Sequence, residues 1–158
     1  MFKPSPVVST DLSVVDAVVA DVVAVRRSMA ALQAREAVLL ASALTAVQAA
    51  TGGARAGSVE AELPVRSLAA ELGAALRVSD RSVQRQLGDA VMLTERFPGT
   101  FAALAAGRIS RAHVAVIMDA GAHLSTPEAR AAYEAAVLPY AEAESATRLK
   151  PVARLRAE

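Results

Sequence analysis

The feature that most constrains the fold is the absence of helix breakers from the N-terminal third of the chain. No Gly or Pro occurs between Pro6 and Gly52, so a helix can run almost unbroken from a cap at residues 9–11. Pairs of Val recur every four residues in this run, which is a helical period and not the alternation of a strand. The pattern predicts a flexible N-terminus over residues 1–10 and a long helical segment, one helix or a helix pair, over residues 11–51.

An apolar stripe follows this segment with alternating spacings of three and four residues, until Glu36 interrupts it. Its members are Val15, Val18, Val22, Val25, Met29 and Leu32, and the apolar arc is widened by Val14, Val19 and Val23. A helix with so broad an apolar face needs partners on more than one side. Two interpretations fit: the stripe is buried within the protein's own helical bundle, or it forms the seam of a homodimer.

The rest of the chain also favours helices. Hydrophobic residues make up 54% of the 158 residues, and Ala alone supplies 38 positions, a composition typical of closely packed helices. The expected segments are, in order, a Gly-rich loop at 51–64, helices at 65–76 and from Ser79 or Asp80 to Arg96, a short helix closed by Gly107, a helix from the Ser110 cap to Gly121, and helices over 126–158 that Pro139 and Pro151 end or disturb. No strand is expected, so the predicted fold class is all-α.

The stretch "ELGAALRVSDRSVQRQLGDA" (residues 71–90) has the pattern of a helix-turn-helix. Its inward positions are apolar (Leu72, Leu76, Val78, Val83 and Leu87), and Gly73 occupies the place where two such helices would cross most closely. The second helix turns Arg81, Gln84 and Arg85 outward, and Arg and Gln suit contacts with guanine and adenine edges. We predict that these three residues face bases of duplex DNA. Two departures weaken the pattern: Arg77 stands in the turn where Gly is commoner, and Gln86 replaces an apolar residue before Leu87.

Positive charge is concentrated on the same part of the chain. Residues 77–111 carry six basic and three acidic groups, and residues 148–158 carry four and one, although the net charge of the chain is only +1. The predicted phosphate contacts are Arg77, Ser79, Arg108 and Arg111, because Arg and hydroxyl side chains are common phosphate ligands. Such a charge excess also fits cations that simply solvate exposed helix faces.

Two longer stretches carry resemblances to known families. "ALRVSDRSVQRQL" followed by "FPGTFAALAAGRISRAH" resembles the helix-turn-helix core of ParB-type partition proteins, with Val114 where a small residue is usual. A broader resemblance runs from about Leu12 to the end of the chain, through "FAALAAGRISRAHVAVIMDA" and "PEARAAYEAAVLPYAEAESATRLKPVARLRAE". These segments are similar to the 13E12-repeat family, whose members carry a helical N-terminal domain of unknown function, usually followed by an HNH endonuclease domain. The resemblance implies a DNA-associated module whose nuclease domain follows Glu158.

We therefore expect one helical domain over residues 11–158, with a helical segment at 11–51 as a possible dimerisation arm, a helix-turn-helix core at 65–121, and C-terminal helices at 126–158 that lead to a further domain. The expected partners are duplex DNA and a second copy of the chain. The competing hypothesis is a dimerisation or protein-interaction module with no direct DNA contact.

The residue types argue against catalysis within these residues. An HNH site needs an Asn and metal-binding His or Asp side chains, and the chain has no Asn and only two His. The spacing of His113, Asp119 and His123 does not suit a metal site, and we expect His113 to tie the turn at 107–110. We expect Glu134, Glu142 and Glu144 to lie on a solvated helix face. With no Cys, signal peptide or membrane-spanning run, we expect a cytoplasmic protein without a metal, cofactor or small-molecule substrate.

Overall fold

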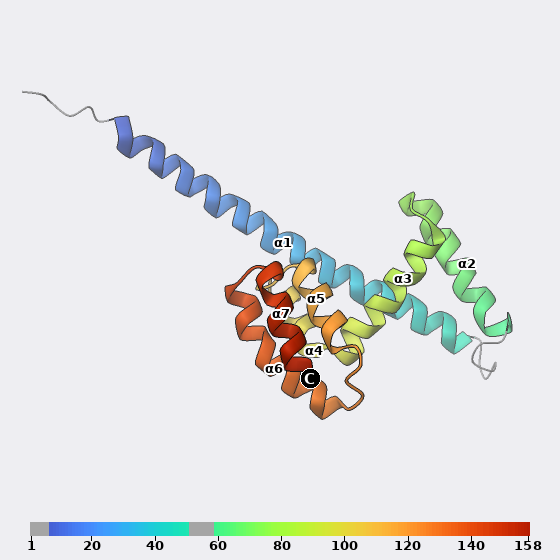
Figure 1. Ribbon diagram of the computed structural model, residues 1–158. Helices are drawn as coiled ribbons and strands as arrows, with labels where there is room; N and C mark the ends of the chain where they lie inside the picture. The colour runs from blue at the N-terminus through green and yellow to red at the C-terminus, as the bar shows by residue number, and fades with distance from the viewer. Residues whose placement is uncertain (1–6, 51–58) are drawn as a thin grey trace, which may run out of the picture.

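The computed structural model describes residues 7–50 and 59–158, and its regular structure is entirely helical (Figure 1). The elements are α1 (Val7–Ala50), α2 (Val59–Leu76), α3 (Asp80–Val91), the π-helical turn η1 (Met92–Arg96), α4 (Pro98–Ala105), α5 (Arg111–Gly121), α6 (Pro127–Ala143) and α7 (Ala146–Ala157). No strand occurs in the described residues, and the predicted all-α fold class is confirmed. Of the segment expected to be flexible, residues 1–6 lie outside the described part of the chain.

α1 is one continuous helix of 44 residues, which corresponds to a length of about 66 Å. It begins at Val7, slightly before the predicted cap. Its N-terminal half projects from the rest of the molecule as an arm, while its second half lies along the other helices (Figure 1). Four alanines spaced by three or four residues make that contact and are buried: Ala30, Ala34, Ala37 and Ala41. Their small side chains let the other helices approach the α1 backbone closely.

Three prolines lie inside helices instead of ending them. α2 begins at Val59 and passes through Pro64, so the prediction that this helix starts at Val65 was wrong. α6 continues past Pro139 to Ala143, and α7 contains Pro151. Proline removes one backbone hydrogen bond from a helix, and buried contacts on both sides of each proline in α6 and α7 hold these helices together. The remainder of the expected loop, residues 51–58, lies outside the described residues.

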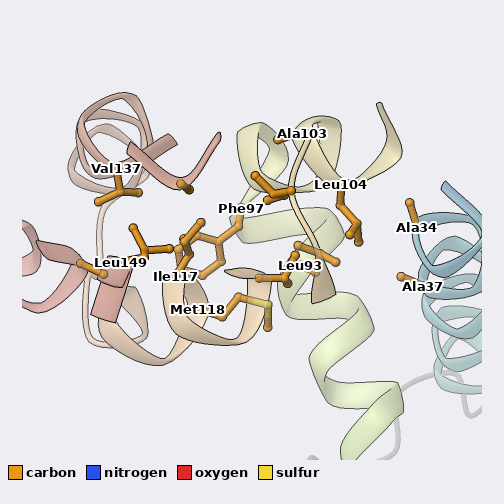
Figure 2. Packing of buried hydrophobic residues seen from close by; sticks show 14 of the residues in the cluster. Ala34, Ala37, Leu93, Phe97, Ala103, Leu104, Ile117, Met118, Val137 and Leu149 are labelled. Atoms are coloured by element: carbon orange, nitrogen blue, oxygen red, sulfur yellow. The ribbon is translucent and has the colours of Figure 1, made fainter. Parts of the chain in front are cut away.

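The main hydrophobic cluster is centred on Phe97, which is fully buried in the segment between η1 and α4. Its ring lies among Leu93, Ile117 and Leu149, whereas Leu104 points toward the alanines of α1 (Figure 2). The cluster therefore joins η1, α4, α5 and α7 to the middle of α1. Helices that follow the predicted helix-turn-helix therefore pack against the middle of the long N-terminal helix.

Glu134 of α6 is 5% exposed and caps the start of α4. Its Oε1 accepts hydrogen bonds from the Thr100 backbone N–H at 2.6 Å and from Thr100 Oγ1 at 2.7 Å, and its Oε2 accepts from the Gly99 N–H at 3.3 Å. The first N–H groups of a helix have no partner within the helix, and here a carboxylate from another helix supplies one. The prediction that Glu134 lies on a solvated face was therefore wrong.

Candidate nucleic-acid interface

The C-terminal part of α1 packs with α2 and α3 as a three-helix unit. Leu44, Ala69, Val83 and Leu87 form its buried centre, and the half-buried side chains around them are Leu40, Val65, Leu68, Leu72 and Val91. The predicted inward positions Leu72, Val83 and Leu87 are confirmed. Leu76 and Val78 are instead 51% and 40% exposed, because they lie at the tip of the turn, beyond the region where the helices face each other.

The turn between α2 and α3 is closed by a hydrogen bond from the Val78 N–H to the Gly73 carbonyl at 3.0 Å. Arg77 has a φ of 57°, so it occupies the left-handed position at which helices usually place Gly. A side chain there costs about 1–2 kcal/mol. The sequence anomaly at Arg77 therefore marks real backbone strain within the turn.

Gly73 has the role predicted for it. A Cβ atom added to Gly73 would lie 2.9 Å from the Val78 carbonyl oxygen and 2.9 Å from Asp80 Oδ1, which is closer than van der Waals contact. Only glycine allows the start of α3 to approach the end of α2 so closely. The crossing of these two helices therefore depends on this position.

α3 turns a polar face to solvent. Val83, Leu87 and Ala90 are buried on one side, while Arg81, Gln84 and Arg85 are all exposed on the other. Arg81 and Arg85 are one helical turn apart, and neither is in an ion pair with another described residue. The acidic Asp80 and Asp89 occupy the two ends of the same helix and are also exposed. The structure thus brings together the three residues predicted to face bases.

Ser79 is the N-cap of α3, since its Oγ accepts a hydrogen bond from the Ser82 backbone N–H at 3.3 Å. This bond orients the first turn of α3. Ser79 and Arg77 are both exposed beside that turn. They therefore lie next to the first turn of α3, which carries Arg81.

The predicted phosphate contacts Arg108 and Arg111 are separated by the fold. Arg108 forms an ion pair with Glu142, with Nε and Oε1 2.7 Å apart, and borders a groove of about 690 Å³ along the α1 arm that has no α3 residue in its wall. Arg111 lines a different cavity of about 530 Å³, together with Asp89 of α3 and with Lys150 and Arg154 of α7. Only Arg111 is a neighbour of α3.

Lys150 and Arg154 were not among the predicted site residues. They are four residues apart on α7, so they share one face of that helix, and both are exposed at the cavity that Arg111 lines. The charge excess of residues 148–158 pointed to this region, but only the packing of α7 against α5 places it beside Arg111. The candidate interface therefore includes basic side chains from α3, α5 and α7.

His113 ties the turn before α5, as predicted. Its Nδ1 accepts a hydrogen bond from the Ser110 backbone N–H at 3.2 Å, and its Nε2 lies 2.8 Å from the Glu144 carbonyl oxygen. These partners fit the tautomer that carries its proton on Nε2. His113 thus joins the start of α5 to the end of α6 and has a structural role. Within the described residues, no group of three His, Cys, Asp or Glu side chains is placed to hold a metal ion.

The apolar stripe of α1 is uncovered along its whole length. Its six members, Val15, Val18, Val22, Val25, Met29 and Leu32, which we call the α1 seam, are between 45% and 63% exposed. Burial of this stripe within the protein's own bundle was one of the two expectations, and it is wrong for these residues.

The helices of the described regions include none that is both long enough and apolar enough to cross a membrane.

Comparison with known proteins identifies a family but no characterised relative. A family described as "Domain of unknown function (DUF222)" matches residues 49–157, which is more than half of the chain. No curated protein and no solved structure matches the sequence significantly. The matched segment covers α2 through α7 and so contains the α2–α3 unit and the surrounding basic side chains. The chain is therefore a member of the DUF222 family of domains of unknown function.

Proposed function

We propose that this chain is a non-catalytic module that binds duplex DNA through α2 and α3. The observation that carries the proposal is the division of α3 into two faces. Val83 and Leu87 hold the helix on α1 and α2, while Arg81, Gln84 and Arg85 are exposed together on the opposite side. A recognition helix needs this arrangement, because its outward side chains must reach base edges in the major groove while its inner face fixes its angle.

The basic side chains around α3 fit contacts with the phosphate backbone. Arg77 lies in the turn before α3, and Arg111, Lys150 and Arg154 line the cavity at its C-terminal end. Asp89 and Asp119 line the same cavity and reduce its positive charge. A single copy should therefore bind weakly and with strong salt dependence. Because Arg108 is already paired with Glu142, it is a weaker candidate for a phosphate contact than the sequence alone indicated.

The wider context of the proposal comes from the family resemblance. DUF222 domains are commonly associated with HNH endonucleases, and the chain also resembles the 13E12-repeat family and the ParB-type helix-turn-helix core. In this proposal the chain supplies DNA contacts to a nuclease domain located elsewhere in a longer protein. Two copies associated through the α1 seam would double the number of phosphate contacts and raise the affinity.

The second candidate function is a dimerisation or protein-interaction module with no DNA contact. It is favoured by the α1 seam, which is long, apolar and uncovered. The near-neutral net charge of +1 also suits it. The two candidates differ in one property that can be measured directly, namely salt-sensitive binding of duplex DNA.

Fluorescence anisotropy with a labelled pool of random-sequence duplexes at low salt tests the proposal. The variant Arg81→Ala/Arg85→Ala should bind at least tenfold more weakly than wild type, because it removes two positive charges from the face that approaches the DNA, and each lost phosphate contact lowers the salt slope by about one. The matched control, Arg148→Ala/Arg156→Ala, removes the same charge from two exposed positions on α7 and should bind nearly as well as wild type. Absence of salt-sensitive binding by wild type, or equal weakening by the two double variants, would refute the proposal and favour the second candidate.

A further inference from the structure

The α1 seam has the spacing of a coiled coil. From Val15 to Leu32 its members alternate by three and four residues, which assigns them to the a and d positions of a heptad repeat. Val15, Val22 and Met29 occupy a positions, and Val18, Val25 and Leu32 occupy d positions. Over residues 15–32 the helix rises roughly 27 Å, and every member of the seam is exposed along that length.

The seam faces away from the body of the protein. The alanines by which α1 contacts the other helices, Ala30, Ala34, Ala37 and Ala41, occupy the b and f positions of the same heptads. These positions lie on the outer side of a coiled coil, roughly opposite the a and d positions. A second helix packed along the seam therefore lies on the side of α1 roughly opposite these alanines, although Val22 and Arg26 also line the groove between α1 and the body. The projecting arm in Figure 1 carries the N-terminal part of this free face.

We propose that the seam binds the seam of a second copy of this chain, with the two α1 helices parallel and in register. The charges beside the seam decide the orientation. In a parallel pair, a residue at a g position lies opposite the e position of the following heptad in the other helix, and this contact sets partner and orientation. Asp21 is at g and Arg26 is at the following e position, so a parallel pair gains two ion pairs between Asp21 and Arg26 of the partner subunit.

The neighbouring g and e positions agree with this orientation. Val14 is at g and Val19 is at the following e position, so the parallel register adds an apolar contact on each side where charge is absent. Both Val14 and Val19 are more than half exposed in the single chain, at 57% and 56%. β-branched residues at a positions, here Val15 and Val22, also favour parallel two-stranded coils.

An antiparallel pair cannot form the same contacts. In that orientation g positions face g positions and e positions face e positions, so Asp21 does not meet Arg26 in any register. Asp21 and Arg26 are both exposed, and neither is in an ion pair with another described residue. The regular seam ends at Leu32, because Glu36 occupies the next a position. Leu39 at the following d position is 62% exposed, and Leu40 beside it is partly covered by the α2–α3 unit. The regular a and d contacts of the parallel dimer are thus confined to residues 15–32.

This inference specifies the self-association included in the proposed function, and a disulfide experiment tests it directly because the chain contains no Cys. In a parallel in-register dimer the two copies of Val18 face each other at a d position. The variant Val18→Cys should therefore form a covalent dimer under mild oxidation, at least tenfold faster than Ala20→Cys, whose f position lies on the outer side. Non-reducing gel electrophoresis measures both rates. Equal rates for the two variants would overturn the proposal.

A charge exchange gives an independent test that uses only exposed positions. Asp21→Arg and Arg26→Asp should each weaken self-association about tenfold in sedimentation equilibrium, because each places like charges at both g–e contacts. The double variant Asp21→Arg/Arg26→Asp should restore association to within about twofold of wild type. A double variant no better than the single variants would exclude the parallel register. Circular dichroism of each variant checks that the helical content is unchanged.

Failure of this inference can be separated from failure of the proposed DNA-binding function. If Val18→Cys cross-links but wild type shows no salt-sensitive binding of duplex DNA, the parallel dimer stands and DNA binding fails. If wild type binds DNA but Val18→Cys does not cross-link faster than Ala20→Cys, DNA binding stands and the parallel dimer fails. The substitutions at residues 18 and 20 are on the arm, far along the chain from Arg81 and Arg85.

Discussion

The geometry of the α2–α3 turn predicts opposite effects for two Gly→Ala substitutions. Replacing Gly by Ala inside a helix stabilises it by about 1 kcal/mol when the new methyl group has room. At Gly88 of α3, an added Cβ meets no atom within 4 Å, so Gly88→Ala should raise the free energy of unfolding by about this amount. At Gly73 of α2 the same atom would lie 2.9 Å from the Val78 carbonyl oxygen.

The carbonyl of Val78 belongs to the backbone of a tight turn, so the clash at Gly73 cannot be relieved by rotating a side chain. Overpacking of this kind costs about 1–3 kcal/mol, which offsets or exceeds the helix-propensity gain. Gly73→Ala should therefore lower the free energy of unfolding by up to about 2 kcal/mol, and the two variants should differ by about 1–3 kcal/mol. That difference measures the cost of the close approach, because the intrinsic preference for Ala is common to both variants.

Urea unfolding followed by circular dichroism measures both variants against wild type. If Gly73→Ala is as stabilising as Gly88→Ala, the missing Cβ does not set the crossing of α2 and α3, and the reasoning fails. DNA binding provides a second measurement on the same proteins. Gly73→Ala should weaken DNA binding because it displaces the start of α3. Gly88→Ala should leave DNA binding nearly unchanged, because it adds only a methyl group to the exposed face of α3.

Two further predictions concern buried polar groups of α6. Glu134→Gln should lower the free energy of unfolding by about 2–3 kcal/mol, because hydrogen bonds to a charged acceptor are worth more than neutral ones. The control variant Glu128→Gln, on the exposed first turn of α6, should lose less than about 1 kcal/mol in the same urea unfolding experiment. Equal losses for the two variants would contradict the capping role of Glu134. Burial, followed by the charges of Glu134 and Asp119, raises the pKa of Tyr133 from 10.0 to about 12, so stability from the neutral phenol is fully present below pH 10 and is lost as the pH rises toward 12. The free energy of unfolding of wild type should fall by about 2–3 kcal/mol across this window, and that of Tyr133→Phe should fall much less. In Tyr140→Phe, Tyr133 is the one remaining tyrosine, so absorbance at 295 nm reports its ionisation directly.

The pattern of apolar residues was sufficient to predict most of the helices. The caps at Ser79 and Ser110 start helices where expected, because an N-cap is a local interaction between neighbouring residues. The prolines were less informative. Pro64 and Pro139 lie inside helices, and in α6 buried contacts on both sides of Pro139 compensate for the missing hydrogen bond. The local sequence shows that a proline removes a helical hydrogen bond, but it does not show the packing contacts that compensate for the loss.

The candidate site was predicted in part. Arg81, Gln84 and Arg85 share one exposed face because helical periodicity alone places them there. Arg108 and Arg111 are close in sequence but line different cavities, and Lys150 and Arg154 join Arg111 only through the packing of α7 on α5. Likewise, Glu134 resembled a surface carboxylate, and its partners Gly99 and Thr100 lie more than thirty residues away in sequence. Contacts between distant helices carry no local signal.

The sequence by itself determined the all-α class, the polar face of α3, the position of Arg77 in the turn and the apolar stripe of α1, because each follows from spacing along a single helix or turn. Only the tertiary structure decided which apolar stripes are covered. It buries the alanines of α1 and leaves the α1 seam exposed, although both have helical spacing. The physical reason is that periodicity defines a face of a helix, whereas the burial of that face depends on which other helices reach it.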